Sequence, residues 1–189
     1  RQWKRGEPMI DLASSTAVIV GVGGSGAEAA RLCQAFGMYT IGVDPRTTEC
    51  PHLDELVGND QLDEVLPRAD FVLITAPEAP STIGMFHRGR FDLMKPTAYL
   101  CNIARGRLVV TDDLVAALQD GRIAGAGLDV VDPEPLPADH PLWTMPGVLL
   151  TPHVAIAGAP GWYERRTAIM MDNARRFAAG EPLINVVDK

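Results

Sequence analysis

Cysteine is scarce in this chain: Cys33, Cys50 and Cys101 are the three cysteines among 189 residues. Their number is odd, they lie far apart and they form no C-x-x-C pair. This argues against a disulfide framework and favours a cytoplasmic protein in a reducing compartment. No second cluster of ligand residues accompanies Cys50 and His52, so we expect no metal site.

Long apolar runs and basic blocks are also missing. The longest apolar stretches, at 17–20 and 71–74, are far shorter than the ~20 residues of a membrane helix. The basic N-terminal residues are not followed by an apolar run, so no signal peptide is recognised. The formal net charge is −7, from 24 acidic and 17 basic residues. An acidic chain without a basic stripe gains no affinity from counterion release, so neither nucleic acid nor a membrane is an expected partner.

Short apolar runs alternate with helical patterns along the chain. The runs are rich in Val, Ile and Leu and mostly continuous, which is typical of strands buried on both faces of a sheet. Strands alternating with helices predict an α/β fold: a Rossmann-type doubly wound parallel sheet in three layers, α/β/α. The predicted strands are 16–21, 39–43, 71–75, 98–102, 125–130 and 148–151, and the predicted helices are 25–36, 52–66, 81–94, 112–120 and 162–179.

A glycine-rich loop follows the first predicted strand and fits the pattern G-x-G-x-x-G. It runs Gly21-Val22-Gly23-Gly24-Ser25-Gly26. In such a loop the glycines allow a tight turn, close backbone approach to a pyrophosphate and close packing of the helix, whose N-terminal N–H groups face the anion. The sequence therefore predicts a dinucleotide site, although a purely structural turn or an S-adenosylmethionine site stays open on these residues alone.

Asp44 ends the second predicted strand, 18 residues after Gly26. That is close to the ~20 residues expected before the acid that binds the adenosine ribose. Its carboxylate would repel the 2′-phosphate of NADP, so NAD is the expected cofactor and NADP is less favoured, with Arg46 nearby as the opposing feature.

Three segments in the second half carry further polar residues. They are Asn102-Ile103-Ala104-Arg105-Gly106, then Gly127-Leu128-Asp129-Val130-Val131-Asp132-Pro133-Glu134-Pro135-Leu136, and Thr151-Pro152-His153-Val154-Ala155. In this order and spacing they closely resemble the D-isomer-specific 2-hydroxyacid dehydrogenase family, and the resemblance extends over about residues 3–187. It implies the NAD-binding domain of an oxidoreductase that transfers a hydride between NAD(H) and a small 2-hydroxy acid or 2-oxo acid, and it implies a homodimer.

The resemblance also implies roles for individual residues. Arg105 resembles the arginine that grips the substrate, His153 the general acid/base, and Glu134 the carboxylate paired with it. Asp129 resembles the acid that holds the nicotinamide carboxamide. The implied cofactor-binding residues are Gly21, Gly23, Gly24, Ser25, Gly26, Asp44, Thr75, Pro77, Thr82, Ile103, Arg105, Asp129 and His153.

The chemistry of these residue types agrees with the implied roles. Reduction of a 2-oxo acid needs a cation for the carboxylate, and arginine offers a planar two-donor fork that stays charged. It also needs a proton donor, and histidine, with an ordinary pKa of about 6.5, can give a proton in one direction and take it in the other. Each motif follows a predicted strand, at the edge where open α/β sheets bind ligands.

Two departures from the family accompany this resemblance. Thr75 stands where the family usually has a histidine on the adenine side. The chain begins with Arg1, and most of the family's second domain has no counterpart in it. We therefore expect residues 1–15 to be the remnant of an interdomain or dimer arm and 16–189 to be the NAD-binding domain. Because domain closure excludes water and completes such sites, we expect this chain to bind NAD(H) but to turn over substrate weakly or not at all.

A different class of function remains open at this stage. The family has a corepressor branch that keeps the same three catalytic residues, so the alternative is a non-catalytic protein that senses NAD(H) and binds a partner.

Overall fold

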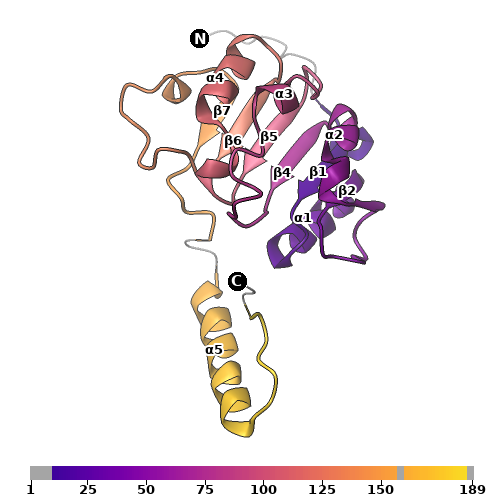
Figure 1. Ribbon diagram of the computed structural model, residues 1–189, viewed down its shortest axis with the longest axis vertical. Helices are drawn as coiled ribbons and strands as arrows, with labels where there is room; N and C mark the ends of the chain where they lie inside the picture. The colour runs from indigo at the N-terminus through magenta and orange to yellow at the C-terminus, as the bar shows by residue number, and fades with distance from the viewer. Residues whose placement is uncertain (1–9, 157–159, 187–189) are drawn as a thin grey trace. The chain divides into compact units, whose positions relative to one another are not determined.

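The computed structural model describes residues 10–156 and 160–186. Contacts divide the chain into two compact units, Arg1–His153 and Val154–Lys189. The first unit contains one sheet of parallel strands in the order β3-β2-β1-β4-β5-β6-β7 (Figure 1). The strands are β1 (Thr16–Val20), β2 (Tyr39–Val43), β3 (Glu55–Val57), β4 (Phe71–Ile74), β5 (Tyr99–Asn102), β6 (Gly125–Leu128) and β7 (Val148–Leu150).

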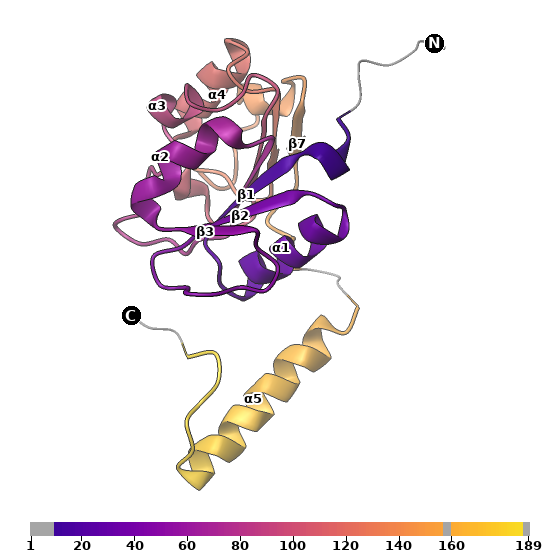
Figure 2. The ribbon, with the colours of Figure 1, turned by 90° about the vertical axis from the view of Figure 1, so that its right-hand side faces the viewer.

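Helices cover both faces of this sheet. They are α1 (Gly24–Ala35), α2 (Leu62–Val65), α3 (Arg88–Phe91) and α4 (Thr111–Gln119). Figure 2 shows α1 on one face and α2, α3 and α4 on the other. The predicted three-layer, doubly wound Rossmann-type fold is therefore confirmed, with the reversal of strand order between β1 and β4.

The hydrophobic core lies between the sheet and the helices α2, α3 and α4, which cover one of its faces. One row of paired residues crosses five strands, and each of its side chains is at most 2% exposed: Val18, Ile41, Val72, Leu100 and Ala126. Full burial of one large apolar side chain contributes about 1.5–3 kcal/mol, so such a row holds the strands firmly in register. Because all strands are parallel, their carboxyl ends form one edge, and the loops that follow β1, β2, β4, β5, β6 and β7 carry the predicted site residues.

Two predicted helices are wrong in part. The segment 52–66 begins as an edge strand, since Glu55–Val57 pairs with β2, and it becomes helical only near α2. Three residues are too few for periodicity to separate a strand from a helix. The segment 81–94 contains only the short helix α3, because Gly84 turns the chain at φ +64° and a turn precedes it.

The second unit contains one helix, α5 (Trp162–Ala179), with the predicted bounds. Gly161 and Gly180 flank it in the left-handed region, at φ 71° and 70°. The Asn173 side chain bonds to both backbone groups of Ile184, at 2.9 Å each, and ties the following segment to the helix. No described residue of α5 is buried, and Phe177 is 79% exposed. Among the described residues, no helix is long and apolar enough to cross a membrane.

Candidate active site

The glycine loop joins β1 to α1 and contains glycines with two different surroundings. A Cβ at Gly21, which lies at φ +94°, would stand 2.5 Å from the Ala76 backbone, and one at Gly26 would stand 2.0 Å from the Gly21 oxygen. These two glycines are needed for the packing of the fold. Gly23 and Gly24 face open space, with nothing within 4 Å of an added Cβ. No side chain caps α1 at Gly23, and uncapped N–H groups at the start of a helix suit an anion.

Asp44 follows β2 and binds the glycine loop. Its carboxylate accepts the N–H groups of Val22, Arg46 and Thr47, each at 2.8 Å. Partial burial acts to raise the pKa of Asp44, but these backbone hydrogen bonds and the Thr47 hydroxyl outweigh burial and hold the pKa below its ordinary value. A fixed negative charge therefore stands beside the glycine loop at the end of β2.

A cleft of about 390 Å³ extends from this loop along the strand ends. Five predicted site residues line it: Ser25, Thr75, Pro77, Ile103 and Arg105. Its other lining residues are Ala76, Glu78 and Ala104. The Thr75 hydroxyl donates to the Gly21 oxygen at 2.6 Å and joins the wall of the cleft to the glycine loop. Thr82 is 6% exposed, and its hydroxyl donates to the Pro77 oxygen at 2.7 Å, so it holds the turn that presents Pro77.

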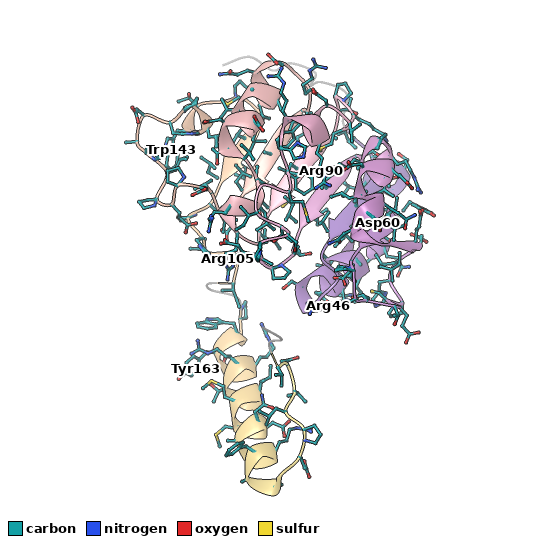
Figure 3. All side chains as sticks on the ribbon, viewed as in Figure 1. Arg46, Asp60, Arg90, Arg105, Trp143 and Tyr163 are labelled. Atoms are coloured by element: carbon teal, nitrogen blue, oxygen red, sulfur yellow. The ribbon has the colours of Figure 1, made fainter. Side chains whose placement is uncertain are left out.

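Arg105 lies in the loop after β5, at the end of the unit where Figure 3 also shows Arg46. Asn102, which is fully buried, accepts the Ala104 N–H at 3.0 Å and donates to the Arg105 oxygen at 2.9 Å. These two bonds fix the shape of the loop, and the guanidinium of the exposed Arg105 donates to the Ala104 backbone oxygen of the same loop at 2.6 Å. A guanidinium held on a rigid turn is suited to bind a carboxylate through two donors.

His153 and Glu134 form an ion pair or hydrogen bond, with Nδ1 and Oε1 2.7 Å apart. His153 lies in the left-handed region at φ 54°, which is rare for a residue other than glycine and often marks a functional site. The backbone N–H of His153 donates to the backbone carbonyl oxygen of Asp129 at 2.8 Å. Asp129, which follows β6, therefore helps to hold His153 in this conformation.

Asp129, Glu134 and His153 line one pocket of about 530 Å³, whose apolar wall includes Leu136 and Trp143. Arg105 and Ile103 line the other cleft, with Ser25, Thr75 and Pro77. The structure thus places the predicted residues in two groups on one edge. The two groups are connected, since the backbone N–H of Asp129 donates to the backbone carbonyl oxygen of Asn102 at 3.0 Å.

Three residues that contribute to this geometry were not predicted as site residues. Asn102 shapes the Arg105 loop, as described above. Gly106 has room for no side chain, because a Cβ there would stand 1.9 Å from the Val131 oxygen. Thr151 donates its hydroxyl to Asp129 Oδ1 at 2.6 Å. Asn102, Gly106 and Thr151 all lie inside the motifs read from the sequence, but only the fold shows which groups they contact. Among the described residues, no group of three His, Cys, Asp or Glu side chains could hold a metal ion.

Comparison with known proteins gives a consistent result. Residues 1–155 match the NAD binding domain of the D-isomer specific 2-hydroxyacid dehydrogenases. The chain is 35% identical to a glyoxylate/hydroxypyruvate reductase A of Photorhabdus laumondii, over 100% of this chain and 59% of that protein. It is 40% identical to the human glyoxylate reductase/hydroxypyruvate reductase, over 77% of this chain and 45% of that protein. The chain thus spans about half of the length of such relatives.

Solved structures give the same comparison in three dimensions. A D-isomer specific 2-hydroxyacid dehydrogenase from Xanthobacter autotrophicus Py2, in complex with NADPH and MES, superposes with a TM-score of 0.89 at 33% identity, over 99% of this chain and 76% of that chain. An NADPH-dependent glyoxylate/hydroxypyruvate reductase from Sinorhizobium meliloti, in complex with NADP and sulfate, superposes with a TM-score of 0.87 at 31% identity, over 99% of this chain and 59% of that chain.

Proposed function

The chain belongs to the D-isomer specific 2-hydroxyacid dehydrogenase family, as a nicotinamide-dinucleotide-binding domain, and on this premise we propose that it serves the interconversion of a small 2-hydroxy acid and a 2-oxo acid. The observation that carries the proposal is the His153–Glu134 pair, 2.7 Å apart, at the edge that also bears Arg105 and Asp129. The relatives named glyoxylate and hydroxypyruvate reductases support short 2-oxo acids as substrates.

The residues present fit a nicotinamide dinucleotide. The open space at Gly23 and Gly24, above an uncapped helix N-terminus, suits the pyrophosphate. Asp44 stands where the adenosine ribose would be bound, and Asp129 would hold the carboxamide at the other end. The cofactor, when bound, supplies or accepts the hydride.

The protein's own residues supply charge and a proton. Because the Glu134 carboxylate accepts a hydrogen bond from Nδ1 of His153, the imidazole keeps Nε2 for exchange of a proton with the substrate oxygen. Arg105 would bind the substrate carboxylate and turn the oxo group toward His153.

We propose NAD rather than NADP as the preferred cofactor. The low pKa of Asp44 keeps its carboxylate charged, and the 2′-phosphate of NADP would add about two negative charges beside it. Because two structural neighbours are bound to NADPH and NADP, the choice between NAD and NADP needs a direct test in this chain. Affinities for NADH and NADPH should differ by tenfold or more in favour of NADH, and replacement of Asp44 by Ser should reduce this difference.

The catalytic proposal is tested with His153→Gln in this chain joined to the remaining domain of a relative. We expect turnover of glyoxylate or hydroxypyruvate at saturating NADH to fall by about 10²–10⁴, the usual contribution of a general acid. His87→Gln is the matched control, because the His87 side chain caps α3 by accepting the Gly89 N–H. Equal turnover in His153→Gln and the unaltered fusion would contradict the role of His153.

We further propose a homodimer and a cytoplasmic location. The family resemblance supports the dimer, although the predicted arm falls largely on residues 1–9, outside the described residues. Sedimentation of the chain at several concentrations tests it. The three cysteines are free, which supports a reducing compartment. The comparisons do not support the alternative of an NAD(H)-sensing interaction protein, and family membership leaves the alternative of an S-adenosylmethionine site without support.

A further inference from the structure

Glu78 lies on the wall of the cleft that the glycine loop and Arg105 also line. We propose that its carboxylate binds the adjacent hydroxyls of the cofactor's second ribose, the one that carries the nicotinamide. This inference rests on the proposed function. It adds a cofactor-binding residue that lies outside the glycine loop and outside the three segments of the second half.

Two other residues of the cleft indicate which part of the cofactor would lie there. Ser25 belongs to the glycine loop, where the pyrophosphate would lie, and Arg105 would bind the substrate carboxylate. In a nicotinamide dinucleotide the second ribose joins the pyrophosphate to the nicotinamide, and the substrate reacts at the nicotinamide ring. The second ribose would therefore lie in this cleft, within reach of its walls.

The charge of Glu78 distinguishes between the groups that could enter the cleft. A carboxylate repels a phosphate or a second carboxylate, whereas a ribose is neutral and carries two adjacent hydroxyls that can donate. Oε1 of Glu78 accepts a hydrogen bond from the Arg107 guanidinium at 3.0 Å. Because an ionised carboxylate has two oxygens with about four acceptor sites, this bond leaves Glu78 able to accept from a diol as well.

The backbone is fixed on both sides of Glu78. The Thr82 hydroxyl donates to the Pro77 oxygen at 2.7 Å and accepts the Ala79 N–H at 2.8 Å. Pro77 and Ala79 are the residues immediately before and after Glu78. A carboxylate that is placed in advance binds its ligand without the cost of being ordered on binding.

Arg107 holds the Glu78 side chain from a second segment. It lies in the 3₁₀ turn Gly106–Leu108, and its backbone oxygen accepts the Gly84 N–H at 2.8 Å, so the backbone already joins the two segments. The side chains of Glu78 and Arg107 are 31% and 55% exposed. Because an ion pair with this exposure contributes little to stability, removal of the Glu78 carboxylate should leave the chain folded.

The experiment measures the affinities for ADP, ADP-ribose and NADH by calorimetric titration of the folded 189-residue chain. ADP carries the adenosine and the pyrophosphate, ADP-ribose adds the second ribose, and NADH adds the nicotinamide to that ribose. We expect Glu78→Ala to weaken the binding of ADP-ribose and of NADH by about tenfold, the scale of one hydrogen bond to a charged group. The affinity for ADP should stay within about twofold of that of the unaltered chain, because exposed charges are screened by salt.

Two further variants separate the hydrogen bond from the loss of an ion pair. Glu78→Gln keeps an oxygen acceptor without the charge, so it should lose less affinity for ADP-ribose than Glu78→Ala does. Asp63→Ala is the matched control, because Asp63 also pairs with an arginine, Arg90, at 2.7 Å, but lies in α2 on the face of the sheet opposite α1. Its three affinities should stay within about twofold of those of the unaltered chain.

Two results would overturn the role of Glu78. One is an unchanged affinity for ADP-ribose in Glu78→Ala, whether or not the affinity for NADH falls. The other is an equal loss of affinity for ADP and for ADP-ribose, which indicates a general structural effect. Failure of the proposed function is distinguishable from both, because it shows in the unaltered chain, which would then fail to bind NADH, and this proposal would fall with it.

Discussion

The Gly26→Ala substitution should lower the stability of the chain. The Gly23→Ala substitution should instead weaken cofactor binding and leave stability nearly unchanged. A Cβ at Gly26 would stand 2.0 Å from the Gly21 oxygen, so α1 must move from β1 by roughly 1 Å to relieve the contact. Overpacking of this kind costs about 1–3 kcal/mol, which lowers the melting temperature by up to about 10 °C at this chain length. A Cβ at Gly23 would meet nothing within 4 Å, and its φ of −83° is ordinary for alanine. The free energy of unfolding of the Gly23→Ala chain should therefore stay within about 1 kcal/mol of that of the unaltered chain.

Binding separates the two substitutions in the other direction. The added methyl at Gly23 occupies the space at the N-terminus of α1 where the pyrophosphate would approach the backbone, so NADH affinity should fall at least tenfold in a protein of normal stability. Thermal unfolding and NADH fluorescence titration of both variants test this. If Gly23→Ala binds NADH like the unaltered chain, or if Gly26→Ala is as stable as that chain, the assignment of one glycine to the ligand and the other to packing is refuted.

Three further predictions concern Gly106, Asp44 and the chain without a second domain. Gly106→Ala should displace the loop that carries Glu134, because its Cβ would stand 1.9 Å from the Val131 oxygen. In the two-domain fusion we expect about 100-fold slower turnover with NADH binding kept. Gly127→Ala is the control, because its Cβ would lie 3.8 Å from its nearest neighbour. Asp44→Asn should destabilise the chain at neutral pH. Because the pKa of Asp44 is lowered in the folded state, its contribution is complete above the ordinary value and is lost as the pH falls through the folded value, so urea unfolding should show the difference shrinking below about pH 4. The 189-residue chain alone should reduce glyoxylate much more slowly than the fusion does, and equal rates would show that the second domain is not needed.

Much of the fold was predictable because the deciding signals are local. Continuous apolar runs mark β1 and β4, and the glycine loop must follow a strand and precede a helix to function as proposed. β3 was missed because Glu55–Val57 is a strand only through its pairing with β2, which the sequence does not show. The same holds for the predicted helix at 81–94, where Gly84 and a side-chain bond within the turn override helix-forming residues.

The candidate site shows a similar division. The residue types and their places at strand ends could be read from the sequence, and the predicted pair of His153 and Glu134 is in contact in the structure. The orientations could not be read. That Thr82 faces inward, that His153 has a positive φ and that Thr151 contacts Asp129 depend on loops from distant parts of the chain that meet only after folding.

The most direct test of cofactor binding is a titration of the folded 189-residue chain with NADH and with NADPH, followed by nicotinamide fluorescence. We expect saturable binding of NADH and weaker binding of NADPH, because the cleft beside the glycine loop would accept the dinucleotide and the charge of Asp44 would disfavour the extra phosphate. NADPH binding as tight as that of NADH would refute the role of Asp44 in selection. A folded chain that binds neither would contradict the central claim that this edge of the sheet is a nicotinamide-dinucleotide site.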